Sequence, residues 1–206
     1  ARLCLAGRER TRLEALAAQA PDTIEADVVD LLDRDAARAW ADGLAARHGR
    51  VDGLVHMVGG WRGGKPLEES PPEDWAWLHD LLVRTVQNAT QAFAPHLVAS
   101  GHGRFVLIST GQAQAPTHPN AAYAAAKAAA ETWTLALADR FKGTGATANV
   151  VVVGGAIVTP AMRAESPEKD FSGSTPAEEI AEAIAYLCSD AAASMNGQRL
   201  VLRGAR

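Results

Sequence analysis

The chain has 206 residues and a mass of 21.6 kDa, which suits a single domain. A formal net charge of -4 excludes a basic nucleic-acid-binding module, and a hydrophobic content of 48% excludes an intrinsically disordered chain. No apolar run approaches the roughly 20 residues of a membrane span, and Cys4 and Cys188 have neither metal-ligand nor disulfide spacing. We therefore expect a cytoplasmic globular protein without a metal site and without nucleic-acid or membrane partners.

Short apolar segments alternate along the chain with longer helical patterns, which is typical of a parallel α/β sheet. The predicted strands are residues 2–6, 23–26, 53–58, 104–108, 148–153 and 199–202. The predicted helices are residues 11–19, 35–48, 74–99, 121–141 and a last one that ends near residue 189. Pro95 should bend the third helix or end it early. No repeat or linker interrupts the pattern, so we predict one domain over residues 1–206.

The beginning of the last helix carries a capping signal. Thr175 precedes Pro176, and Glu178 follows three residues after the threonine. This spacing predicts a capping box with Thr175 at the N-cap and proline at the first helical position.

A tyrosine and a lysine four residues apart carry the strongest chemical signal. On the predicted helix, Tyr123 and Lys127 share one face. An ammonium group beside a phenol favours the phenolate, so we expect the pKa of Tyr123 to fall toward the working pH. Such a phenol can exchange a proton with a carbonyl or an alcohol. Ser109 and Thr110 end the preceding strand, at the sheet edge where open α/β sheets bind ligands.

This layout resembles the short-chain dehydrogenase/reductase family over nearly the whole chain. The residues that carry the resemblance are Ser109-Thr110, Tyr123 with Lys127, Asp27-Val28, Val58-Gly59-Gly60, Thr159-Pro160, the sequence AFAPHL at 92–97, and Asn196-Gly197. The resemblance implies a Rossmann-like, doubly wound parallel sheet in three α/β/α layers. It also implies a nicotinamide-dependent oxidoreductase that interconverts an alcohol and a ketone or aldehyde by hydride transfer.

The resemblance implies a role for each residue of the predicted active site. A hydroxyl polarises the substrate carbonyl, Tyr123 transfers the proton, and Lys127 holds the nicotinamide ribose while lowering the pKa of the tyrosine. The family's serine commonly lies thirteen residues before the tyrosine, and Thr110 stands there. We favour Thr110 and keep Ser109 as the alternative, because a loop differing by one residue would restore it.

Cofactor preference is expected at the turn after the first strand. The resemblance places the adenosine ribose beside Gly7 and Arg8, where the strand ends without an acidic residue and a guanidinium follows. This favours NADP(H) over NAD(H). The other implied cofactor contacts are Asp27 and Val28 toward adenine, Val58, Gly59 and Gly60 at a turn, and Thr159 toward the carboxamide. Loops at the expected substrate end contain Trp61, Gln112, His118 and Met162.

Two departures from the family pattern affect the expected proton path. The chain has His56-Met57-Val58-Gly59 where the family commonly has Asn-Asn-Ala-Gly, and Leu82 where an asparagine commonly relays protons. Because leucine cannot hold a water chain, we expect the relay to run differently. His56 either rebuilds part of this polar network or is a structural histidine.

The family's glycine-rich phosphate turn, Gly-x-x-x-Gly-x-Gly, does not occur in the 206 residues. In the family this turn follows a first strand that would precede residue 1 and lie at the centre of the sheet. Without that strand, two strands should be separated by a gap of about 9 to 10 Å, because neighbouring strands lie roughly 4.8 Å apart. We therefore expect the working protein to have upstream residues, or another segment, that supply the strand and turn.

The missing phosphate turn, Leu82 and the altered Asn-Asn-Ala-Gly segment motivate an alternative function. The chain would then be a catalytically impaired binding or scaffolding protein on this fold. Retention of Tyr123, Lys127 and Arg8 favours the enzyme. The expected partners are a small carbonyl or alcohol substrate and other copies of the chain. The long helices 74–99 and 121–141 resemble those that join family subunits, which implies a homodimer or homotetramer.

Overall fold

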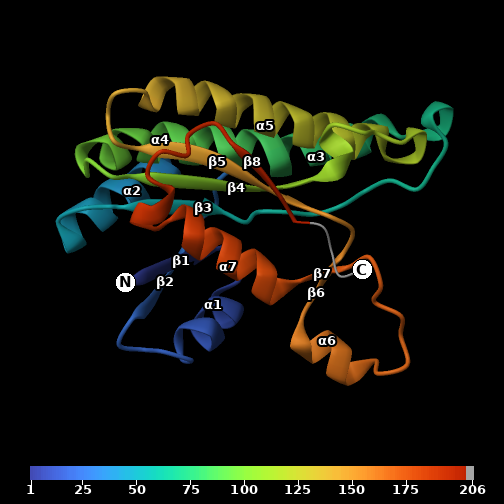
Figure 1. Cartoon of the computed structure of the whole chain (residues 1–206), viewed down its shortest axis with the longest axis horizontal. Helices are drawn as coiled ribbons and strands as arrows, with labels where there is room; N and C mark the ends of the chain where they lie inside the picture. The colour runs from blue at the N-terminus through green and yellow to red at the C-terminus, as the bar shows by residue number, and fades with distance from the viewer. Residues whose placement is uncertain (203–206) are drawn as a thin grey trace.

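The computed structural model describes residues 1–202 and has a parallel sheet between two layers of helices (Figure 1). Four strands form the main sheet in the order β3-β4-β5-β8. These strands are β3 (Gly53–His56), β4 (Arg104–Thr110), β5 (Thr147–Val153) and β8 (Arg199–Leu202). The predicted Rossmann-like α/β/α architecture is confirmed.

A second, two-stranded sheet is formed by β1 (Leu3–Gly7) and β2 (Ile24–Val28), which pair in parallel with Cys4 opposite Glu25. Within residues 1–202, no backbone ladder joins β1 to β3. This break between β1 and β3 lies where the sequence predicts that the family's first strand would stand between two strands. The short helix α1 (Arg10–Ala17) connects β1 to β2.

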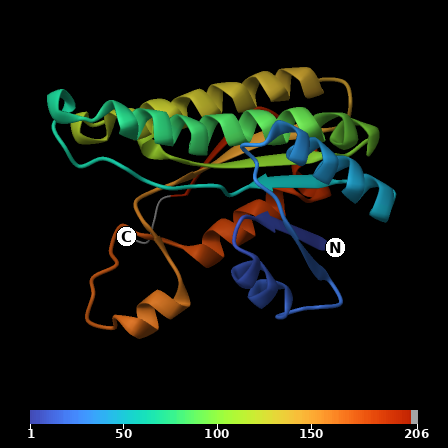
Figure 2. The same cartoon turned by 180° about the vertical axis from the view of Figure 1, so that it is seen from behind.

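Helices cover both faces of the main sheet unequally (Figures 1 and 2). One face is covered by α2 (Arg34–His48), α4 (Thr85–Ala99) and α5 (Ala121–Phe141), and the other by α7 (Ala177–Leu187). Side chains alternate along β4 accordingly, so that Phe105 and Leu107 belong to the large core and Val106 to the smaller one under α7.

The predicted helix 74–99 consists of three consecutive parts: α3 (Pro72–His79), a π-helical turn (Asp80–Arg84) and α4. Of the two effects expected of Pro95, an early end of the helix is wrong, because α4 continues past the proline to Ala99, while a bend stays a prediction. The irregularity lies instead at the π turn, where Thr85 donates its hydroxyl to the carbonyl oxygen of Leu81 at 2.6 Å. The π turn contains Leu82, the residue that replaces the expected asparagine.

The region after β5 contains elements that the sequence analysis did not predict. Strands β6 (Ile157–Val158) and β7 (Thr175–Pro176) pair in parallel and flank α6 (Pro160–Glu165). The predicted capping box is wrong, because Thr175 donates its hydroxyl to the carbonyl of Gly154 at 2.6 Å and α7 begins at Ala177. The 3-10 turns are Leu67–Glu69, Gly111–Ala113, His118–Asn120 and Asp190–Ala192. None of the helices in residues 1–202 could span a bilayer.

Candidate active site

Lys127 is positioned at the carboxyl end of β4 by the packing of α5 on the sheet. Its side chain is 6% exposed, and Nζ donates to the carbonyl oxygen of Ile108 at 2.9 Å. Burial lowers the pKa of Lys127 to about 8, although the nearby Glu131 carboxylate opposes this shift. The structure therefore places the predicted lysine directly beside the predicted strand-end hydroxyls.

Tyr123 lies one helical turn before Lys127 on α5 and packs against an apolar cluster that includes Leu82 and Ala126. Burial raises the pKa of its phenol. This differs from the expected lowering, because the ammonium group of Lys127 bonds to Ile108 while the phenol is surrounded by carbon. The replacement of a polar residue by Leu82 contributes directly to that apolar environment.

The two candidate hydroxyls at the end of β4 have different hydrogen-bond partners. Ser109 is buried and donates its hydroxyl to Glu131 Oε1 at 2.5 Å. Thr110, only half-buried, accepts a long 3.4 Å bond from the amide of Gln112. Among residues 1–202 its hydroxyl has no recorded acceptor, so its proton is free for a ligand.

Glu131 is a buried residue of this region that the sequence analysis missed. It lies one helical turn after Lys127 on α5 and accepts from Ser109 and from Arg199 on β8, with Arg199 Nε 2.8 Å from Oε2. No local pattern marks the pairing, because Glu131 and Arg199 are 68 positions apart. The ion pair connects α5 to β8, the edge strand of the main sheet. Glu131 also accepts the hydroxyl proton of Ser109.

His56 ends β3 and is 3% exposed. Its Nε2 lies 3.2 Å from Thr85 Oγ1, whose own proton is donated to Leu81. Thr85 must therefore accept from His56, which assigns the imidazole proton to Nε2. Burial, followed by the charge of Lys127, lowers the pKa of His56 to about 3. The imidazole is thus neutral and anchored to the π turn.

The first comparisons with known proteins identify the family of this site. Residues 1–204 match the family model described as enoyl-(acyl carrier protein) reductase. A short chain dehydrogenase of Pseudocercospora fijiensis is 32% identical over 148 residues, which are 69% of this chain and 47% of that protein. The chain belongs to the short-chain dehydrogenase/reductase family.

Two further members of the family cover more of the chain. The 3-oxoacyl-[acyl-carrier-protein] reductase of Thermotoga maritima is 28% identical over 89% of this chain and 77% of that protein. A gluconate 5-dehydrogenase from Burkholderia cenocepacia, crystallised with NADP and tartrate, superposes with a TM-score of 0.85 at 27% identity. That superposition covers 99% of this chain and 84% of the dehydrogenase chain. The short-chain dehydrogenase fold thus extends over the described residues.

The predicted cofactor residues of this family member lie at the carboxyl ends of β1 and β2, with one difference. Arg8 is exposed between β1 and α1, and Val28 is 46% exposed at the end of β2. Asp27, however, accepts from Trp40 Nε1 at 3.0 Å and from Arg47 Nη2 at 2.6 Å, so α2 already engages its carboxylate. The contact of Asp27 with adenine stays a prediction.

The remaining predicted cofactor positions lie in the segment after β3 and at the start of α6. A Cβ added to Gly59 would have its nearest neighbour, a carbonyl oxygen, at 3.8 Å, so a ligand can approach this backbone closely. Gly60 and Val58 lie in the same segment after β3, although a Cβ at Gly60 would come within 2.6 Å of Trp77. Thr159 caps α6 by accepting from the amide of Met162.

The substrate end contains one orphaned polar atom. Gln112 Oε1 is buried and has no hydrogen-bond partner within residues 1–202. Such atoms are rare, because an unsatisfied buried acceptor costs free energy. The atom fits a ligand that donates a hydrogen bond. Trp61 is exposed in the loop after β3 and donates to Asn120 Oδ1, whereas Met162, expected in a loop, is exposed in the first turn of α6.

The low pKa of His56 predicts a contribution to acid unfolding. Because the folded value of about 3 lies below the unfolded value of 6.5, the unfolded chain binds more protons across this window. The contribution of His56 to the free energy of unfolding is fully present above about pH 6.5 and is lost as the pH falls toward 3. We expect His56→Gln to flatten the fall in unfolding free energy between about pH 7 and pH 4, measured by urea titration.

His118→Gln is the matched control, since His118 is exposed in the loop before α5. Its pH dependence should follow that of the unaltered protein. An equal slope for His56→Gln and the unaltered protein would contradict a neutral buried imidazole.

Proposed function

We propose that this chain carries the catalytic half of an NADP(H)-preferring oxidoreductase that interconverts an alcohol and a ketone or aldehyde. The observation that carries the proposal is the placement of Tyr123 and Lys127 on one face of α5, with Lys127 bonded to the carbonyl of Ile108, two residues before Thr110. The named relatives of the family support the reaction class, since they include a gluconate 5-dehydrogenase and a 3-oxoacyl reductase.

In the proposed reaction, Thr110 donates its free hydroxyl proton to the substrate oxygen and so polarises the carbonyl. Tyr123 transfers its phenolic proton to that oxygen in reduction and removes it in oxidation. Lys127 holds the nicotinamide ribose and favours the phenolate when its ammonium group is turned toward the phenol. The bound nicotinamide supplies or accepts the hydride.

The direct test of the proposal is a survey of carbonyl compounds as substrates with NADPH, followed by alcohols with NADP. The alternative, a binding or scaffolding protein, is favoured by Leu82 and by the sequence His56-Met57-Val58-Gly59, which both depart from the family pattern. Thermal denaturation with NADPH separates the two. The enzyme should be stabilised by mass action, whereas a scaffold should show no shift. A homodimer or homotetramer and a cytoplasmic location stay predictions.

Thr110 rather than Ser109 is expected to be the hydroxyl that polarises the substrate. Thr110→Ala should lower kcat by about 100- to 1,000-fold, the usual cost of losing one oxyanion donor. Thr110→Ser keeps the donor and should retain most of the activity. Ser109→Ala removes the bond to Glu131 and should lower the melting temperature more than kcat. Steady-state kinetics of the three variants decide; a larger kcat loss for Ser109→Ala would reverse the assignment.

Arg8 is expected to determine the preference for NADP(H). Arg8→Asp places a carboxylate where a 2′-phosphate would bind, so the Kd for NADPH should rise at least tenfold while that for NADH falls. Isothermal titration with both cofactors measures this. The matched control is Arg12→Asp, which makes the same charge change at an exposed position of α1. An unchanged NADPH affinity in Arg8→Asp would exclude this basis of preference.

A further inference from the structure

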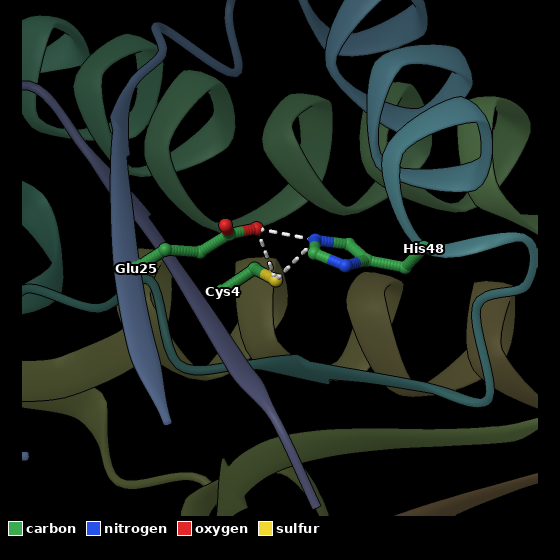
Figure 3. Close-up of side chains that lie close together, drawn as sticks. All are labelled: Cys4, Glu25 and His48. Carbon is green, nitrogen blue, oxygen red and sulfur yellow. Dashed lines mark hydrogen bonds and ion pairs between the residues drawn. The ribbon is translucent and has the colours of Figure 1, made fainter. Parts of the chain in front are cut away.

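Three metal-ligating side chains that the active site does not use converge near the amino ends of β1 and β2. Cys4 lies on β1, Glu25 on β2, and His48 is the last residue of α2; Figure 3 shows them pointing toward one another. Their atoms Sγ, Oε1 and Nε2 all lie within 4.8 Å of one another. No other group of this kind was found within residues 1–202.

The convergence follows from the local topology. Parallel pairing sets Cys4 directly opposite Glu25, so their side chains share one face of the two-stranded sheet. Helix α2 runs back over this face and ends at His48, followed by Gly49 in the left-handed conformation. This end of the two-stranded sheet lies opposite Gly7, Arg8 and the expected cofactor edge.

We propose that Cys4, Glu25 and His48 bind a Zn²⁺ ion that cross-links β1, β2 and α2. Thiolate, imidazole and carboxylate are all ligands of zinc, whereas Mg²⁺ and Ca²⁺ prefer sets made only of oxygen. The three protein ligands leave a fourth position for a solvent molecule, and the partial exposure of the three side chains allows one to enter.

The present distances require only a small adjustment for metal binding. Zinc bond lengths of about 2.0 to 2.3 Å in a tetrahedral site separate ligand atoms by roughly 3.3 to 3.6 Å. Cys4 Sγ and His48 Nε2 are 3.8 Å apart, already near this spacing. Glu25 Oε1 is closer to both, at 2.8 Å from Sγ and 2.6 Å from Nε2. Its flexible, partly exposed side chain need only withdraw by under about 1 Å.

Charge and protonation in the cluster also suit a cation. The thiol of Cys4 donates its proton to Glu25 Oε1 at 2.8 Å, so a proton already lies between two of the proposed ligand atoms. Zinc would take the place of the thiol proton, which is released to solvent. The neighbouring Arg47 guanidinium lies 2.6 Å from Asp27 but 3.3 Å from Glu25. Arg47 Nη2 also donates to Glu25 Oε1, but at the longer of the two distances, so zinc would have to replace only this weaker contact while Asp27 keeps the guanidinium.

The ion would act on a part of the structure that no strand pairing joins to the main sheet. Within residues 1–202 the two-stranded sheet makes no backbone ladder with the main sheet. Much of its attachment runs instead through α2, which packs on α4, with Cys4 and Trp40 at the edge of the large core. A bond from β1 and β2 to the end of α2 would therefore stabilise this attachment.

The test uses the purified protein after treatment with a chelator. Addition of Zn²⁺ should raise the melting temperature, and titration in buffers of different ionisation enthalpy should show about one proton released per ion. Addition of Co²⁺ should produce a thiolate-to-metal charge-transfer band. Cys4→Ser should lose this band, and both Cys4→Ser and His48→Gln should weaken zinc binding by at least about tenfold.

The matched controls are Cys188→Ser and His96→Gln, which alter the other cysteine and a histidine paired with Asp42. Both should bind zinc as the unaltered protein does. Three results would overturn the proposal: no thermal shift with Zn²⁺, an equal shift with Mg²⁺, or undiminished zinc binding in Cys4→Ser. The absorption band identifies the cysteine ligand even if a variant is less stable.

Discussion

Tyr123→Phe should lower kcat for carbonyl reduction by about 100- to 10,000-fold, the range expected for loss of a general acid. The substitution removes one hydroxyl and leaves the aromatic ring against Leu82 and Ala126, so the packing of α5 is retained. Substrate and cofactor affinity should change little, because the hydroxyl acts mainly in the transition state. Steady-state kinetics measure the loss of the acid, and thermal denaturation of the same preparation measures any loss of packing.

The sequence offers a matched control, since Tyr186 is the other of its two tyrosines. Tyr186 is 44% exposed on α7, on the opposite face of the main sheet from α5. Tyr186→Phe should retain full activity and change stability by less than about 0.5 kcal/mol. Retention of more than a tenth of kcat in Tyr123→Phe would exclude the tyrosine as the acid and favour the scaffolding alternative.

Glu131→Leu is expected to have the largest effect on stability. It leaves the partly buried guanidinium of Arg199 and the hydroxyl of Ser109 without their carboxylate. Removing one partner of a buried ion pair costs about 3 to 5 kcal/mol, and the value here should lie at the lower end because the Arg199 side chain is 25% exposed. Urea unfolding measures the loss.

The same substitution should affect Lys127. The Glu131 carboxylate raises the pKa of this lysine against the effect of burial, so its removal should bring the pKa further below about 8. Less of the ammonium form would then be present at neutral pH. We therefore expect kcat of Glu131→Leu to recover as the pH is lowered. If the pH dependence of kcat is parallel in Glu131→Leu and in the unaltered protein, the role of Glu131 is structural only.

Two further variants test whether the Glu131–Arg199 ion pair accounts for the loss of stability. Asp139→Asn breaks an exposed ion pair with Lys142 near the end of the same helix and should leave the unfolding free energy unchanged. The double variant Glu131→Leu with Arg199→Met replaces both charges by apolar groups and should recover much of the lost stability. Equal losses in the single and double variants would contradict an unpaired buried charge as the cause.

The Tyr123–Lys127 pair could be predicted because its geometry is local. Tyr123 and Lys127 are four residues apart on a helix, and that spacing alone puts them on one face. The bond of Lys127 to the Ile108 carbonyl was not predicted, because it depends on how α5 packs on β4. The apolar environment of Tyr123 could not be derived in this way, because it depends on how α3, the π turn and α5 pack together.

The errors at helix ends have the same origin. Thr175 has the sequence of an N-cap, but its hydroxyl satisfies Gly154 after β5, 21 positions earlier. Pro95 has the sequence of a helix break, yet α4 continues to Ala99. Local propensities are worth roughly 1 kcal/mol at a cap, and tertiary hydrogen bonds and packing of similar size can override them.

The amino-acid sequence by itself determined the α/β class, the family and the Tyr123–Lys127 pair, because each depends on periodicity or on spacing within a few residues. Only the tertiary structure decided that Ser109 is engaged by Glu131 while Thr110 is free. It also joined Cys4 to His48, although sequence spacing predicts no metal site. Residues 44 positions apart meet only when strands and helices pack, and no local pattern specifies that contact.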